Sequence, residues 1–136
     1  MNAKRSFTRL IRIGYVILFI IPFPYIIGST WSYYSMQNAR GYVHGYSDPF
    51  EIIAQNKNSV NILSFEYGEI FLRAFMVSLL IVPFHLLANY IASKYLVGIP
   101  FYRKLAIALI SVYLIAFLLI FRTEPFGGWY LKLMLD

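Results

Sequence analysis

Cysteine is absent from this sequence of 136 residues. Without a thiol, the chain's own residues form no disulfide, no cysteine-ligated zinc site, no iron–sulfur cluster and no thiol nucleophile. The sequence also shows no nucleophile–base pair, no phosphate-binding loop and no set of metal ligands. We therefore expect a protein that is not an enzyme and that carries no metal and no cofactor.

Charged residues are scarce as well. They make up 13% of the chain, against about 25% in soluble domains, while 60% of the residues are hydrophobic. The aromatic share is 19%, and many Tyr and Trp residues stand just outside apolar runs, as is typical of membrane interfaces. The net charge of +6 does not indicate nucleic-acid binding, because the basic residues adjoin membrane-length apolar runs, where anionic lipids attract them.

Three apolar runs are long enough to cross a bilayer. The central run, 69–92, would be about 35 Å long as a helix, against roughly 30 Å of hydrocarbon. The first covers 13–29 and the third 105–122, so we expect an all-α integral membrane protein with three transmembrane helices. Pro22 and Pro24 should kink the first helix, and the carbonyls that they free should be covered by other parts of the protein.

The distribution of charge predicts the orientation. Basic residues occupy a lead at 1–12 and the connection 93–104, and neither segment contains an acid. All six acids lie in or beside the segments 30–68 and 123–136. By the positive-inside rule the first two segments are cytoplasmic and the other two extracytoplasmic. This predicts a multi-pass protein of the bacterial inner membrane, N-in and C-out.

The outer segment, 30–68, divides into two parts. Its first part, to residue 47, shows no sustained helical or strand period, which indicates an interfacial loop. A short helix is expected at about 49–56, because Asp48 can cap it and Glu51 lies three residues after the cap. A helix of this length is unstable alone in water, so we expect it to lie on the membrane surface or against the spans.

Aromatic residues of the outer segment and of the tail, 123–136, are candidate contacts with the interface and with a partner. In the tail, adjacent Trp129 and Tyr130 favour an interfacial anchor. The candidate aromatic contacts are Trp31, Tyr33, Tyr34, Tyr42, Tyr46 and Trp129.

Charged residues mark the start of the central helix. Glu66, Glu69 and Arg73 share one stripe at about 100° per residue. The spacing predicts an ion pair at the outer rim, in which Arg73 reaches outward from the membrane. The alternative is that this outer-rim cluster docks a charged residue of a partner.

Polar residues continue along the same helix on a second stripe. Ser78, His85 and Asn89 share it, and Pro83 between them cannot donate to the carbonyl of Leu79. Polar groups in lipid are costly, so this polar lane should face protein. It can form hydrogen bonds between the helices or bind a partner. A further alternative is that His85 ligates a haem or donates to a quinone.

These features favour a small non-enzymatic membrane protein that binds another integral membrane protein, with homo-oligomerisation as an open alternative. It would act as an accessory subunit or as an immunity or exclusion factor. The layout resembles in kind the immunity proteins of pore-forming bacteriocins, which are short, basic and multi-span. It is also similar to the three-span anchor subunits of succinate dehydrogenase and fumarate reductase. That resemblance implies haem b or a quinone at His85, on the second span.

Overall fold

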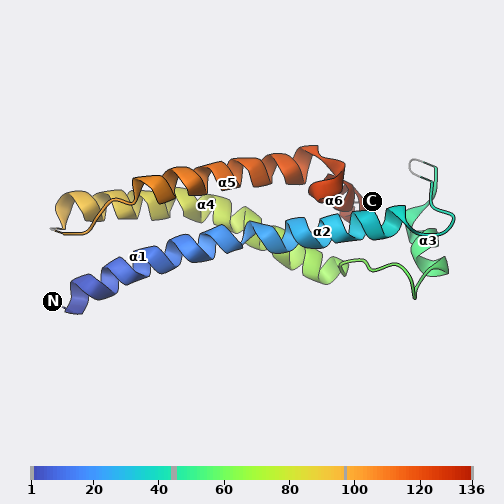
Figure 1. The fold of residues 1–136 in the computed structure, drawn as a ribbon, viewed down its shortest axis with the longest axis horizontal. Helices are drawn as coiled ribbons and strands as arrows, with labels where there is room; N and C mark the ends of the chain where they lie inside the picture. The colour runs from blue at the N-terminus through green and yellow to red at the C-terminus, as the bar shows by residue number, and fades with distance from the viewer. Residues whose placement is uncertain (1, 44–45, 97, 136) are drawn as a thin grey trace.

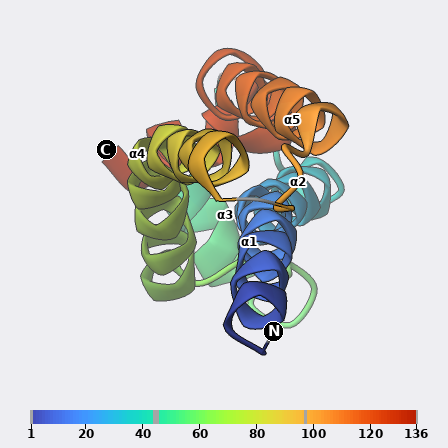
Figure 2. The same cartoon turned by 90° about the vertical axis from the view of Figure 1, so that its left-hand side faces the viewer.

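Helices make up the fold, and three long rods run along its longest axis (Figure 1). The computed structural model describes residues 2–43, 46–96 and 98–135, and over these residues it contains no strand. The elements are α1 (Asn2–Ile20), α2 (Pro22–Gln37), α3 (Pro49–Gln55), α4 (Phe65–Tyr95), α5 (Arg103–Arg122), the π-helical turn η1 (Glu124–Gly128) and α6 (Trp129–Leu135). Seen end-on, α1, α4 and α5 form a triangle (Figure 2).

Three helical stretches are long and apolar enough to cross a membrane. They are Ala3–Gln37, Glu66–Tyr95 and Arg103–Arg122. The expected all-α fold with three membrane-length helices is confirmed, and the helices indicate a multi-pass membrane protein. We call the end that holds the N-terminus and the α4–α5 connection the basic end. The opposite end, which holds the α2–α4 connection, η1 and α6, is the aromatic end (Figure 1).

The first rod is longer than the expected span of 13–29. It begins at Asn2, breaks at Ile21 and continues as α2 to Gln37. The interpretation of 30–47 as a loop was therefore wrong for its first eight residues. One buried stripe continues through α2 with steps of three or four residues, but two of its members are serines, which hid the apolar period. The stripe consists of Pro22, Tyr25, Ser29, Ser32 and Met36.

The break between α1 and α2 follows from proline chemistry. Pro22 has no amide hydrogen, so the carbonyl of Leu18, four residues earlier, loses its helical donor. The hydroxyl of Tyr113, on α5, donates to this carbonyl at 2.9 Å in the buried interior. The expectation that another helix covers a freed carbonyl is confirmed here.

The short helix α3 forms where the sequence predicts one. The side chain of Asp48 accepts a hydrogen bond from the amide of Phe50 at 2.9 Å, which caps the first turn. Ile52 is the buried residue of this helix. The capping pattern at Asp48 therefore identified the start of the helix correctly.

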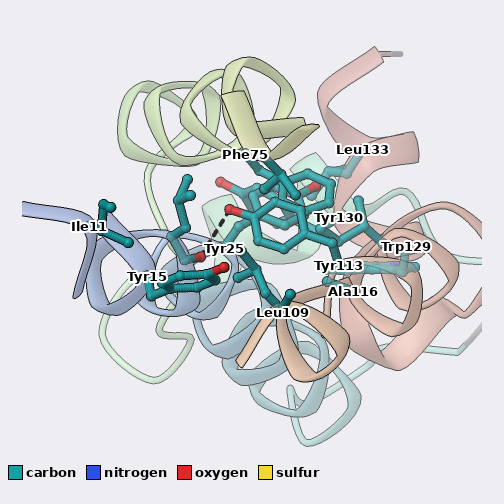
Figure 3. Close-up of a cluster of buried hydrophobic side chains, with 14 of the residues drawn as sticks. Ile11, Tyr15, Tyr25, Phe75, Leu109, Tyr113, Ala116, Trp129, Tyr130 and Leu133 are labelled. Atoms are coloured by element: carbon teal, nitrogen blue, oxygen red, sulfur yellow. Dashed lines mark hydrogen bonds between the residues drawn. The ribbon is translucent and has the colours of Figure 1, made fainter. Parts of the chain in front are cut away.

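The core lies where the three rods meet, and aromatic rings are its largest side chains (Figure 3). Phe75 of α4 stacks on Tyr113 of α5, with 5.7 Å between ring centroids. Large aliphatic and aromatic side chains such as Leu80, Phe84 and Leu114 point outward instead and are exposed. An apolar exterior of this extent suits lipid rather than water.

The C-terminal tail folds back into the protein. Gly127 has a φ of 141°, and a Cβ there would meet the backbone of Ile120 and the ring of Tyr25 at 3.1 Å. This tight turn brings α6 against α2, where Trp129 and Tyr130 are buried (Figure 3). The prediction that Trp129 is a surface contact was wrong, because the reversal at Gly127 directs the helix inward.

Candidate functional site

Asn89 of the polar lane is a buried hub that joins three parts of the chain. Its Oδ1 accepts from the hydroxyl of Tyr15 on α1 at 3.0 Å and from the amide of Tyr102 at 3.2 Å. Its Nδ2 donates to the carbonyl of Pro100 at 3.1 Å. The side chain thus fixes α1 and the α4–α5 connection to α4. For this residue the structure shows interhelical hydrogen bonding, one of the two roles expected of the lane.

Ser78 is buried too, and its hydroxyl bonds to a carbonyl of its own helix. It donates to the carbonyl of Phe75 at 2.6 Å. A serine hydroxyl that donates a hydrogen bond to a carbonyl of the preceding turn is satisfied even in an apolar environment. Ser78 therefore needs no partner from another protein.

His85 lies at the contact between α4 and α1. Its ring packs edge-on against Tyr15, with 4.6 Å between centroids, and a Cβ at Gly14 would lie 2.4 Å from its Cε1. Nε2 is buried and has no hydrogen-bond partner among the described residues. A haem iron on Nε2 would need open space that α1 occupies. The packing therefore does not fit the haem alternative.

The outer-rim cluster contains one ion pair. Arg73 donates to the carboxylate of Glu69, one turn earlier on α4, and the two side chains are 77% and 52% exposed. Glu66 is exposed on the preceding turn. The pairing that the spacing predicts is present. Its exposure places it in the class of ion pairs that contribute little to stability.

The aromatic candidates divide by burial. Trp31 is 63% exposed and Tyr34 53%, and Tyr46 is also exposed. Tyr33 is half-buried and packs against Trp129, with 5.9 Å between ring centroids. Half-buried Tyr42 and buried Trp129 complete the set. Only the exposed members present most of their surface for contact.

Trp31 and Tyr34 border a groove of about 600 Å³ at the aromatic end. Its walls come from α2, from the connection before α4 and from η1. We call it the aromatic groove, and its lining residues are Ile26, Ile27, Thr30, Trp31, Tyr34, Ser35, Asn38, Ser59, Asn61 and Phe126. Apolar side chains thus stand beside amides and hydroxyls, a mixture that is typical of binding sites.

Serines of α2 hold one wall of the groove in place. The hydroxyl of Ser35 accepts from the amide of Asn61 at 2.7 Å, and that of Ser32 accepts from the amide of Leu63 at 2.9 Å. Sequence reasoning missed this wall. The signal was the repetition of serine at positions 29, 32 and 35, on the helix face that meets the connection.

The hydroxyl of buried Tyr130 fixes the same connection from the other side. It donates to the carbonyl of Leu63 at 2.6 Å. Burial raises the pKa of Tyr130 to about 12, so the hydroxyl keeps this proton in alkaline solution in which an exposed tyrosine loses it. Both the amide and the carbonyl of Leu63 are thus satisfied by side chains, which gives the groove a defined shape in the absence of a partner.

Comparison of the chain with protein-family models, with curated proteins and with solved structures found no match.

Proposed function

We propose that this protein is a small, non-enzymatic protein of the bacterial inner membrane that binds another integral membrane protein through the aromatic groove. It would serve as an accessory subunit of a larger complex or as an immunity or exclusion factor. The observation that carries the proposal is the exposure of Trp31 and Tyr34 on a preformed groove. Trp and Tyr are enriched among the residues that supply most of the energy of protein interfaces.

The polar part of the groove supports a protein partner. Asn38 and Asn61 offer amides, and Ser59 offers a hydroxyl, beside the two aromatic rings. Lipid tails cannot use such donors and acceptors, whereas a polypeptide can. Because hydrogen bonds already fix the groove wall, a partner would meet little ordering cost there.

The length of the first rod supports a position at the outer interface. The 35 residues of Ala3–Gln37 span about 52 Å, well beyond the roughly 30 Å of hydrocarbon. The last turns of α2, with Trp31 and Tyr34, therefore reach the headgroup layer. A partner that is itself embedded in the bilayer could contact the groove at this level.

Charge supports the orientation with the groove outside. The sequence contains no acid at 1–47 or 70–123, so the basic end carries cations alone. Positive segments stay on the cytoplasmic side of the membrane. The cations of the basic end are Lys4, Arg5, Arg9, Arg12, Lys94, Arg103 and Lys104.

Site-specific photocrosslinking in the native membrane tests the proposal. A photoreactive residue at Tyr34 should capture one discrete, saturable protein, whereas the same residue at Leu80, on the apolar exterior, should capture lipid. Trp31→Ala should reduce the Tyr34 adduct, and Tyr95→Ala, which removes an exposed tyrosine at the basic end, should leave it unchanged. Lipid adducts alone at both positions would show that these aromatic residues serve only as membrane anchors.

A further inference from the structure

A second cavity lies at the basic end, away from the aromatic groove. It measures about 530 Å³ and opens between one face of α1 and the α4–α5 connection. We call it the basic cavity, and it is lined by Lys4, Arg5, Thr8, Arg9, Arg12 and Gly98. Four of these six residues are cations, and the sequence places no acid within the segments that form the walls.

Two contacts give this cavity its shape. Gly98 has a φ of 80°, and a Cβ there would lie 2.0 Å from Nζ of Lys4, so the lysine amine rests against the glycine backbone. Nε of Arg12 donates to the hydroxyl of Tyr102 at 2.8 Å, and its guanidinium lies 5.4 Å from the centre of that ring. The amide of Tyr102 is in turn bound by Asn89. The buried hub of the polar lane therefore positions Arg12.

The chemistry of these walls suits phosphate. The bond to Tyr102 engages Nε of Arg12, and the guanidinium carries two further nitrogens that can donate to phosphate oxygens. Arg5 and Arg9 stand one turn apart on the same face, and Thr8 lines the cavity with them. A phosphodiester carries one negative charge, so four cations favour a ligand with more than one phosphate.

An apolar cavity of about 420 Å³ adjoins the basic one. Lys4 lines both, and the remaining walls of the second come from Ala3, Phe7, Tyr95, Leu96 and Ile99. A free anion would use only the basic cavity. A lipid, whose phosphate is joined to glycerol and acyl chains, would use both.

We propose that the two cavities together bind an anionic phospholipid, with its phosphates among Lys4, Arg5, Arg9 and Arg12 and its first acyl carbons against Phe7 and Leu96. Basic pockets between helices on the cytoplasmic side bind such headgroups. A diphosphate lipid binds more tightly than a monophosphate lipid, and a zwitterionic lipid binds least. This site is independent of the proposed partner, which binds at the opposite end.

Native mass spectrometry of the full chain in detergent tests the site. The probes are cardiolipin, phosphatidylglycerol and phosphatidylcholine. Arg5→Gln combined with Arg9→Gln should weaken cardiolipin binding roughly thirty-fold, because each cation near a headgroup contributes a several-fold factor. The matched control, Arg103→Gln with Lys104→Gln, removes two exposed cations at the same end but outside both cavities. It should weaken binding less than three-fold, roughly, since only the diffuse field changes.

Competition with inorganic phosphate separates a lipid ligand from a free anion. Excess inorganic phosphate should leave bound cardiolipin in place, and Leu96→Ser should weaken cardiolipin without changing the binding of phosphate. If phosphate displaces cardiolipin, the ligand is the anion alone and the lipid assignment fails. The assignment would also fail if the variant at Arg5 and Arg9 and the control at Arg103 and Lys104 lost cardiolipin binding equally. Equal binding of all three lipids would overturn it as well.

Discussion

The two ends of the bundle use polar and aromatic residues in opposite ways. At the basic end, the buried amide of Asn89 binds the protein's own backbone and Tyr15, while the cations remain exposed. At the aromatic end, Tyr25 and Tyr130 form the interior, while Trp31 stays exposed beside the groove. Residue type alone therefore does not separate the structural roles from the binding roles that we propose.

The difference between the two ends follows from what an amide and an aromatic ring each require of their environment. A buried amide is shielded from water, so it must find its donors and acceptors within the protein. Near the headgroups an aromatic ring is stable either inside the protein or at the interface. The role of Asn89 is thus fixed by hydrogen bonding, whereas that of Trp129 depends on the path of the backbone after Gly127.

Asn89→Ala should produce the largest loss of stability. It leaves the hydroxyl of Tyr15, the carbonyl of Pro100 and the amide of Tyr102 without their shared partner, at a total cost of roughly 3 kcal/mol. Thermal unfolding in detergent measures the change, and Asn58→Ala, in an exposed turn, is the control. Crosslinking at the aromatic groove should persist below the melting point. An unchanged unfolding midpoint in Asn89→Ala would show that Asn89 does not order the basic end.

Gly14→Ala should cause the second largest loss of stability, about 2 kcal/mol. The added methyl would overlap the imidazole of His85. In the double variant with His85→Ala, most of this loss should be recovered, since the side chain that clashes is gone. The non-additivity of the two changes, measured by unfolding, identifies the contact. Strictly additive losses would show that His85 does not close the space next to α1.

Tyr113→Phe should cost about 1 kcal/mol, because it leaves the carbonyl of Leu18 unpaired in an apolar interior. Tyr90→Phe removes a hydroxyl from an exposed ring and serves as the control. Unfolding in the same detergent compares the two. Equal midpoints for both variants would mean that Pro22 creates no requirement for a donor from α5.

This last contact illustrates what could be predicted from the sequence. The length of the apolar runs predicted three rods, Pro22 predicted a freed carbonyl, and Asp48 predicted the start of α3. The helical spacing of Ser78, His85 and Asn89 predicted that this face of the central helix packs against protein. Each of these inferences is local, because it depends on residues within one or two turns of a helix.

The remainder depends on contacts between distant segments. The groove wall forms because serines of α2 bind amides 26 and 31 residues away, and the serine repeat does not indicate which amides it meets. The burial of Trp129 depends on the left-handed backbone at Gly127, which the sequence permits but does not require. The fold was therefore largely predictable, whereas the site at the aromatic end was not.

Tyr130 makes the stability of the aromatic end depend on alkaline pH. Its ordinary pKa of 10.0 rises to about 12 on burial, so between these values the unfolded chain loses the proton first. The free energy of unfolding should then fall as pH rises above 10, by less than about 1 kcal/mol at pH 10.5. The difference between the wild type and Tyr130→Phe, from thermal unfolding, should shrink over this range. If the stabilities of the wild type and of Tyr130→Phe changed in parallel with pH, Tyr130 would not be the source of the pH dependence.

The smallest effect is expected at the outer-rim cluster. Arg73→Gln removes the ion pair with Glu69, but both side chains are mostly exposed, so the loss should stay below about 0.5 kcal/mol and vanish in high salt. Glu66→Gln is the matched control, because it also removes one charge from this stripe of α4 but leaves the pair of Arg73 and Glu69 in place. If Arg73→Gln left stability unchanged but reduced the crosslink at Tyr34, the cluster would belong to the partner interface. The binding surface of the aromatic end would then extend from α2 onto α4.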